Sequence, residues 1–271
     1  MKKNIIIFGT KLAITSVLIF SFLSCNHTVK SNEANSSNNS DLALVNSNLE
    51  PTTNNKIPDL YYGVDTRFAA IKKTDIHNAT TIYDFLNDGE AQQIAHINSV
   101  GIIIIKDNQQ SEIQEYGESD QLTDAQLKIL RSTDYFSHFT IRTEFKEKNK
   151  ETGKLDERFF GPHITVVPDK QAVYIDGNEA LINYLKDNSK ESMTIIKGDN
   201  LGAIKISFIV TKEGTVSKVT HDAMTTGYSS IDKKLIELVK NIPGEWTAAE
   251  NSKGEKIDYE FVFTFGPANG C

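Results

Sequence analysis

The stretch "NIPGEWTAAENSKGEKIDYEFVFTF" (241–265) is the most strongly patterned part of this 271-residue chain. Pro243 and Gly244 stop a helix, the single tryptophan follows at Trp246, and Gly254 centres a turn. Aromatic residues then alternate with polar ones, which predicts a strand with one face in a core and the other in water. The aromatic face consists of Tyr259, Phe261, Phe263 and Phe265, and the opposite face carries Asp258, Glu260 and Thr264.

Two helices and two strands are predicted before this closing strand. Residues 177–188 have apolar side chains at helical spacing, and residues 202–223 predict two strands joined by a turn at Gly214. Residues 229–244 begin with Ser229 and Asp232, spaced as a capping box, and continue as an amphipathic helix. Its apolar stripe consists of Ile231, Leu235, Leu238, Val239 and Ile242. The predicted order is helix, strand, strand, helix, strand, with helices on one face of an antiparallel sheet and water on the other.

Residues 57–168 predict a separate, largely antiparallel α+β domain. Thr123 and Gln126 form a capping box at the start of a short helix, and a charged segment over 146–157 is expected as a solvated hairpin tip. The other expected elements are a helix over 78–88 and strands over 97–107, 111–117, 136–146 and 158–169. The fold class is therefore α+β, with one domain over 57–168 and a second over 169–271.

Residues 1–24 predict a lipoprotein signal peptide. Lys2 and Lys3 precede an apolar run that is shorter than the about 20 residues of a membrane-spanning helix. The run ends at "FLSC", which resembles a bacterial lipobox, so Cys25 is the expected site of lipid attachment. A cleaved signal with an incidental cysteine and an uncleaved anchor helix are the alternatives.

The segment after the predicted lipid is polar and the predicted mature chain is acidic. Residues 25–56 are rich in Asn, Ser and Thr, which predicts a flexible tether, with an ordered cap as the alternative. Removing residues 1–24, which contain Lys2, Lys3 and Lys11 and no acidic residue, takes the formal net charge from −7 to −10. Such a chain repels phosphate, so a nucleic-acid partner is not expected.

Four pieces of the second domain resemble the TonB C-terminal domain family, in the variant found in many envelope proteins of Gram-negative bacteria. In family order they are "DGNEALINYLKDN" (176–188), "GAIKISFIVTKEGTVSKV" (202–219), "GYSSIDKKLIELVKNIPGEW" (227–246) and "NSKGEKIDYEFVFTF" (251–265). The motif positions within them are Gly214, Asp232, Pro243, Trp246 and Gly254. The resemblance covers about residues 168–265 and is carried by the order of the pieces.

The resemblance implies a partner-binding module and no enzymatic activity. Domains of this family engage TonB-dependent outer-membrane receptors by pairing an extended receptor segment with a sheet edge. By the resemblance, the docking edge of this chain is the closing strand, with Lys256, Asp258, Glu260, Val262 and Thr264. The alternative for this strand is a purely structural edge whose charges guard against aggregation.

The chain departs from the energy-transducing members of that family. It has only six prolines, hence no proline-rich spacer, and Ala248 stands where the family has proline after the tryptophan. Asn26 after the cysteine favours an outer-membrane lipoprotein that faces the periplasm, bound to the membrane through its N-terminal lipid and acting in a transport-related role. The alternative is a sensor or structural lipoprotein that uses the fold as a scaffold, related to domains attached to membrane metallopeptidase sensors. An envelope hydrolase is a more distant reading.

No catalytic, cofactor or metal motif is found in the sequence. HExxH, GxSxG, P-loop and GxGxxG patterns are missing, and no two of the six histidines are three or four residues apart. His138 and His163 lie on predicted strands. Their alternatives are an approach to each other across a sheet, as a metal pair would need, and separate structural roles at a sheet rim, of which the second is favoured. Cys271 has no partner if Cys25 carries lipid. Trp246 is expected as a core residue, with a role in an interface as the alternative.

Overall fold

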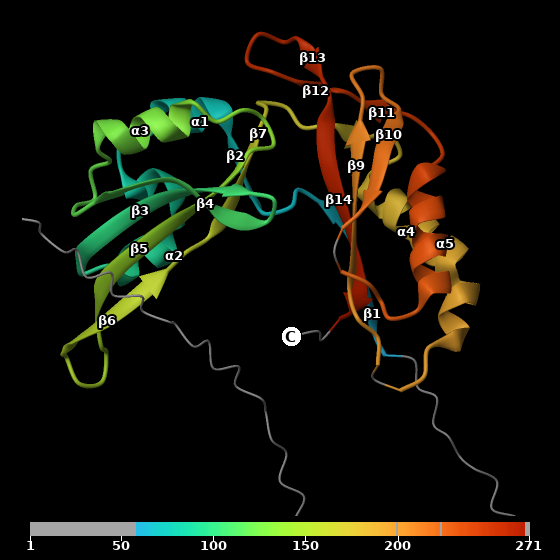
Figure 1. The fold of residues 1–271 in the computed structure, drawn as a ribbon, viewed down its shortest axis with the longest axis horizontal. Helices are drawn as coiled ribbons and strands as arrows, with labels where there is room; N and C mark the ends of the chain where they lie inside the picture. The colour runs from blue at the N-terminus through green and yellow to red at the C-terminus, as the bar shows by residue number, and fades with distance from the viewer. Residues whose placement is uncertain (1–57, 199, 223, 269–271) are drawn as a thin grey trace, which may run out of the picture. The chain divides into compact units, whose positions relative to one another are not determined.

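The computed structural model describes residues 58–198, 200–222 and 224–268. The predicted signal peptide 1–24, the predicted lipidation site Cys25, the predicted tether 25–56 and Cys271 lie outside the described residues. The fold is mixed α+β with mostly antiparallel sheets, about 26% helix and 41% strand, which confirms the predicted class. Its main sheets have six and four strands (Figure 1).

The six-stranded sheet has the order β2-β7-β5-β3-β4, and β6 also pairs with β5. All its pairs are antiparallel except the parallel pair β2–β7. The bounds are β2 Ala69–Lys72, β3 His96–Lys106, β4 Gln109–Gly117, β5 His138–Lys148, β6 Leu155–Phe160 and β7 His163–Val167. The prediction of a single strand over 158–169 is wrong, because β6 ends at Phe160 and β7 begins at His163, with Gly161 and Pro162 between them. The two strands pair with different parts of β5.

Short helices pack on the six-stranded sheet. They are α1 (Lys73–Asn78), the 3-10 helix η1 (Ile82–Phe85), α2 (Asp88–Gln93) and α3 (Asp124–Arg131). Ile76 of α1, Ile82 of η1 and Leu130 of α3 join one buried cluster with the side chains of β3 and β5. The capping box of Thr123 and Gln126 is confirmed, because each side chain accepts a hydrogen bond from the other residue's backbone N–H.

The single helix expected over 78–88 is wrong. The Asp84 carboxylate accepts hydrogen bonds from the backbone N–H groups of Thr80 and Thr81, and these bonds hold the pKa of Asp84 below its usual value. Asn87 then starts α2 with its own capping box to Glu90. Two capping side chains only three residues apart start two separate short helices, so no continuous helix forms.

The four-stranded sheet has the order β1-β14-β9-β10 and is antiparallel throughout. Its strands are β1 (Leu60–Asp65), β9 (Ile204–Val210), β10 (Val216–His221) and β14 (Tyr259–Pro267). The helices of this part are α4 (Asn178–Ser189), the 3-10 helix η2 (Lys190–Ile195) and α5 (Ser229–Lys240). Two short antiparallel pairs complete it: β8 (Val173–Tyr174) pairs with β11 (Trp246–Thr247), and β12 (Ala249–Glu250) pairs with β13 (Lys256–Ile257). The order α4, β9, β10, α5, β14 is the order predicted from the sequence.

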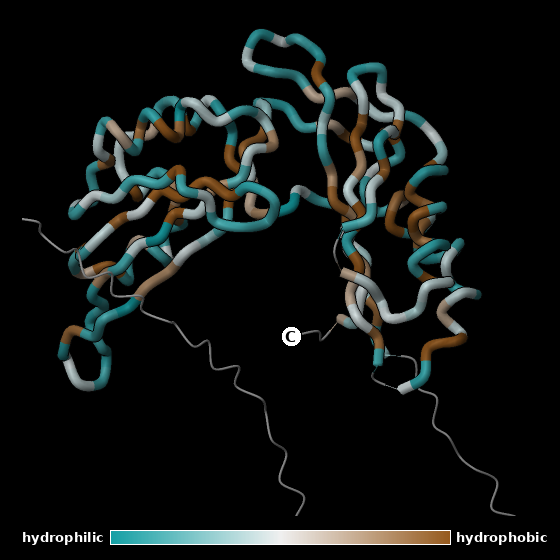
Figure 2. Tube along the Cα trace, viewed as in Figure 1, coloured by the Kyte–Doolittle hydropathy of each residue, from teal (hydrophilic) through white to brown (hydrophobic). Residues whose placement is uncertain are grey.

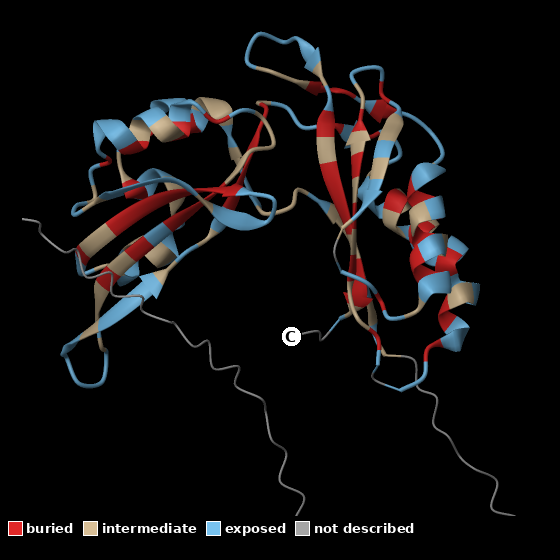
Figure 3. Cartoon of the chain, viewed as in Figure 1, coloured by how far each residue is buried: buried red, intermediate tan, exposed pale blue. Residues whose placement is uncertain are grey.

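The helix-facing side of this sheet is an aromatic and aliphatic core. Tyr259, Phe263 and Phe265 of β14 are fully buried, as predicted, and α5 buries Leu235 and Val239 against them. Figure 2 shows apolar and polar residues alternating along α5, and Figure 3 shows its buried side and the buried length of β14. The ring centroid of Trp246 lies 5.2 Å from that of Phe261 and 6.0 Å from that of Phe208, so the tryptophan is a core residue.

The predicted capping box of Ser229 and Asp232 is wrong. Asp232 accepts hydrogen bonds from the hydroxyl of Thr225 and from both the hydroxyl and the backbone N–H of Thr226. The helix itself has no side-chain cap at its first residue. Asp232 therefore holds the loop that leads into α5. Its partners lie six and seven residues earlier in the chain, whereas a capping box joins residues three apart.

Candidate functional site

The closing strand is an interior strand of the sheet. β14 pairs with β9 on one side and with β1 on the other, in a register that runs from Leu60 opposite Pro267 to Asp65 opposite Val262. The pairing continues beyond β1, because the backbone N–H of Ala268 donates to the carbonyl of Asp59 at 2.7 Å. The expectation that this strand forms the sheet edge is therefore wrong, and Figure 1 shows β1 beside it.

The five predicted docking residues are separated by this arrangement. Lys256 lies in β13, and the carboxylate of Asp258 accepts a hydrogen bond from the backbone N–H of Lys212 in the β9–β10 turn. Glu260 and Thr264 are half-buried, and Val262 is buried although it points away from the helices. The water-facing side predicted for this strand is thus partly covered.

β1 holds its place mainly through Tyr62. The ring lies 4.9 Å from the ring of Phe265 and 6.2 Å from that of Phe263, between centroids. The Tyr62 hydroxyl is hydrogen-bonded to the hydroxyl of Ser189 at 2.9 Å, and the ammonium of Lys186 lies 5.9 Å from the ring centroid. Burial raises the pKa of Tyr62, and the bond to Ser189 opposes that rise. The end of α4 thus forms a polar pocket for one tyrosine hydroxyl.

The residues of β1 point alternately toward the core and away from it. Leu60 and Val64 are half-buried against the core on the side of Tyr62, whereas the side chain of Tyr61 is 52% exposed on the opposite side. The ring of Tyr61 lies over Gly63, where any Cβ would meet its hydroxyl. The strand therefore presents an aliphatic-x-Tyr-x-aliphatic pattern to the core. This alternation over Leu60 to Val64 was the one sequence signal that could have identified β1.

An ion pair lies where β1 ends. The guanidinium of Arg67 contacts the carboxylate of Asp222 at 2.8 Å, and the side chains are only 14% and 16% exposed. A second guanidinium nitrogen donates to the hydroxyl of Ser207 in β9 at 3.3 Å. Burial raises the pKa of Glu260, Arg67 lowers it, and Asp222 raises it further. The polar side of the four-stranded sheet therefore uses Arg67 to balance two carboxylates.

His138 and His163 do approach each other across the six-stranded sheet. Both rings pack on Phe68, with centroid distances of 5.2 Å and 5.0 Å. Each imidazole Nδ1 is hydrogen-bonded to a threonine hydroxyl, His138 to Thr165 at 3.1 Å and His163 to Thr140 at 2.6 Å. Within the described residues no group of three or more His, Cys, Asp or Glu is arranged to hold a metal ion. The contacts of the two histidines are those of structural residues.

His138 predicts a pH dependence of stability. Burial, with a smaller effect of Arg67, lowers its pKa from 6.5 to about 4, so the folded chain keeps it neutral where the unfolded chain takes up a proton. Stability should therefore fall as pH drops from 6.5 to about 4, by about 2 kcal/mol after allowance for partial exposure. Urea unfolding at several pH values should show this slope in the wild type and in the control His96→Gln, which changes an exposed histidine. An unchanged slope in His138→Gln would contradict the assignment.

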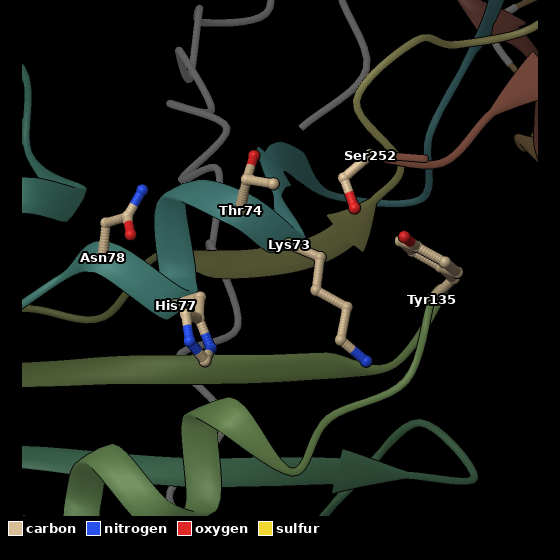
Figure 4. Close-up of a pocket in the computed structure, with 6 residues that line it drawn as sticks. All are labelled: Lys73, Thr74, His77, Asn78, Tyr135 and Ser252. Carbon is tan, nitrogen blue, oxygen red and sulfur yellow. The ribbon is translucent and has the colours of Figure 1, made fainter. Parts of the chain in front are cut away.

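The pockets of the described chain offer little chemistry. One cavity of about 290 Å³ is lined by Lys73, Thr74, His77, Asn78, Tyr135 and Ser252. Figure 4 shows Lys73 reaching toward Tyr135, with His77 and Asn78 set apart. The Lys73 ammonium lies 5.4 Å from the Tyr135 ring centroid and 3.8 Å from the Asp134 carboxylate. The lysine is thus engaged by an aromatic ring and by an exposed carboxylate.

Comparison of the chain with family models, with curated proteins and with solved structures finds no match. Among the described residues, no helix is long and apolar enough to cross a membrane.

Proposed function

We propose that this protein is a lipid-anchored, non-enzymatic protein of the cell envelope that binds a protein partner by strand addition to its four-stranded sheet. The proposal joins the predicted lipoprotein signal and the resemblance to TonB C-terminal domains with the geometry of β1 and β14. A TonB-dependent outer-membrane receptor, exposing an extended periplasmic segment, is the kind of partner that the resemblance implies. The role would be related to transport, without force transmission through this chain.

One observation carries the proposal. β1 pairs with β14 although about 200 residues separate them in the chain, and it does so at the place where the resemblance puts the partner strand. The side of β14 that β1 occupies thus has the backbone groups and the core contacts to accept an extended antiparallel segment. The other outer strand of this sheet, β10, is less suited because its pairing with β9 is irregular between Ser217 and Thr220 and Lys218 has a φ of 44°.

In-cell photo-crosslinking tests this proposal. Crosslinkers at Tyr61, exposed on β1, and at Thr264 of β14, opposite Gly63, should between them capture the periplasmic segment of an outer-membrane barrel protein, identified by mass spectrometry of the crosslinked peptide. Capture at Thr264 indicates a segment that replaces β1, and capture at Tyr61 indicates one added outside β1. A crosslinker at Phe159, 72% exposed on β6 of the six-stranded sheet, is the control and should capture no such segment. Capture from Phe159 alone would overturn the proposal in favour of a role for residues 57–168.

A second candidate is the scaffold or sensor lipoprotein. It is favoured by the pairing of β14 on both sides and by the structural use of Asp258. In that case neither Tyr61 nor Thr264 captures a partner while the protein is folded and lipidated.

A further inference from the structure

We propose that β1 is a built-in substitute for the partner strand, and that an extended segment with the pattern aliphatic-x-Tyr-x-aliphatic displaces it from β14. This inference rests on the proposed function and deepens it, because it states which side chains the partner brings.

The contacts of β1 define what the site recognises. Tyr62 enters a place bounded by Phe263, Phe265 and the C-terminal end of α4, where Ser189 meets its hydroxyl and Lys186 faces its ring. A phenylalanine would leave the buried hydroxyl of Ser189 without this partner, although that hydroxyl also donates to the carbonyl of Lys186. Tyrosine is therefore the preferred residue, flanked two positions away by aliphatic side chains in the places of Leu60 and Val64.

β1 is also less firmly held in the sheet than β9 and β14 are. Its core-facing residues Leu60, Tyr62 and Val64 are only half-buried, whereas Phe208 of β9 and Phe263 of β14 are fully buried. Gly63 lies in its middle and weakens it, because glycine has no side chain to pack and loses more chain entropy on folding. Without β1, the strands β14, β9 and β10 still share a core with α4 and α5.

If β1 left the sheet, the exposed side of β14 would be more stable with another strand bound than without one. The unpaired backbone groups of β14 and the rings of Phe263 and Phe265 would face water, so an empty edge is costly. A partner segment that matches the three core-facing positions recovers these interactions. The chain would thus be protected from self-association while it waits for a partner, and the partner's affinity would be reduced by the cost of opening β1.

Binding of a labelled peptide to the full chain tests the exchange. The peptide is a fluorescent copy of residues 58–66, PDLYYGVDT, titrated by anisotropy into the lipidated protein in detergent. Tyr62→Ala in the chain weakens its own β1, so this variant should bind the peptide about tenfold more tightly than the wild type does. Tyr62→Ala in the peptide should weaken binding to that variant by about tenfold or more.

Tyr61 offers a matched control, since it is the neighbouring tyrosine on the exposed side of the same strand. Tyr61→Ala in the chain or in the peptide should change the affinity less than about twofold, because it removes no contact with the core. Val64→Ala is the second chain variant, which shortens one core-facing side chain of β1 and leaves the site on β14 and α4 unchanged. It should tighten peptide binding by about threefold even if Tyr62→Ala proves poorly folded by circular dichroism.

The outcomes separate this inference from the proposed function. Equal affinity of the wild type, Tyr62→Ala and Val64→Ala for the peptide would overturn the exchange of β1. Dimers of the variants in light scattering, with no gain in peptide affinity, would also overturn it by identifying β1 of a second copy as the occupant. Capture of a barrel segment at Tyr61 in cells together with either result would leave the proposed function standing, with the partner added outside β1.

Discussion

Gly214→Ala should lower the free energy of unfolding by about 3 to 4 kcal/mol. Gly214 closes the β9–β10 turn with a φ of +79°, and an added Cβ would overlap the backbone carbonyl oxygen of Trp246. The same place joins the turn to the strand that carries the tryptophan, because the N–H of Trp246 donates to the carbonyl of Gly214 at 3.2 Å. Alanine therefore adds left-handed backbone strain and also pushes a core segment away.

Gly254→Ala is the matched control for this prediction. Gly254 has a similar φ of +75° in the turn between β12 and β13, but an added Cβ would meet no atom within 4 Å. The control should cost only the left-handed strain, about 1 to 2 kcal/mol. Urea unfolding of both variants measures the difference, and equal losses would contradict the contact with Trp246 as the cause.

These two glycines show what the sequence could and could not predict. Both turns were predicted, because a glycine between two alternating runs needs no tertiary information. The difference between them comes from Trp246, which lies more than thirty residues away from Gly214 in the chain and reaches it only through the fold. Local patterns thus identified β9, β10, α5 and β14, each of which has a clear period or stop signal.

The place of β14 in the sheet could not be predicted in the same way. Its pattern of aromatic and polar residues is the same for an edge strand and an interior one, because alternation reports on the two faces and carries no information about neighbours. The neighbour, β1, is six residues long and includes Gly63, so it gave only a weak strand signal. The sequence therefore predicted β14 as a strand, but its neighbour β1 was missed.

The Arg67–Asp222 pair was missed for a related reason. Arg67 follows β1 directly, and its partners Ser207 and Asp222 come from β9 and from the end of β10. No spacing in the sequence links them. Glu260 was predicted as a docking residue from the resemblance and from its place on the polar face of the strand. The structure places it half-buried beside this ion pair, where burial raises its pKa.

Arg67→Leu should lower the free energy of unfolding by about 3 kcal/mol at neutral pH. The change removes the positive charge that Asp222 meets at 2.8 Å, in a site where both side chains are mostly buried. It also removes the one group that lowers the pKa of Glu260, so this pKa should rise further. A carboxyl whose pKa is higher in the folded chain than in the unfolded chain destabilises the fold at high pH, and protonation relieves this as pH falls. The loss of unfolding free energy in the variant should therefore shrink as pH falls toward 4.5.

Arg158→Leu separates this effect from the loss of any arginine. Arg158 also pairs with a carboxylate, that of Glu147 at 3.2 Å, but its side chain is 54% exposed on β6. Its removal should cost no more than about 1 kcal/mol, since exposed pairs contribute little. The double variant Arg67→Leu/Asp222→Asn should regain part of the loss at neutral pH, because no unpaired charge remains at position 222. Equal losses of stability for the two arginine variants would show that the charge pair at Arg67 contributes no more than an exposed pair does. A loss in Arg67→Leu that does not change with pH would show that Arg67 does not control the pKa of Glu260.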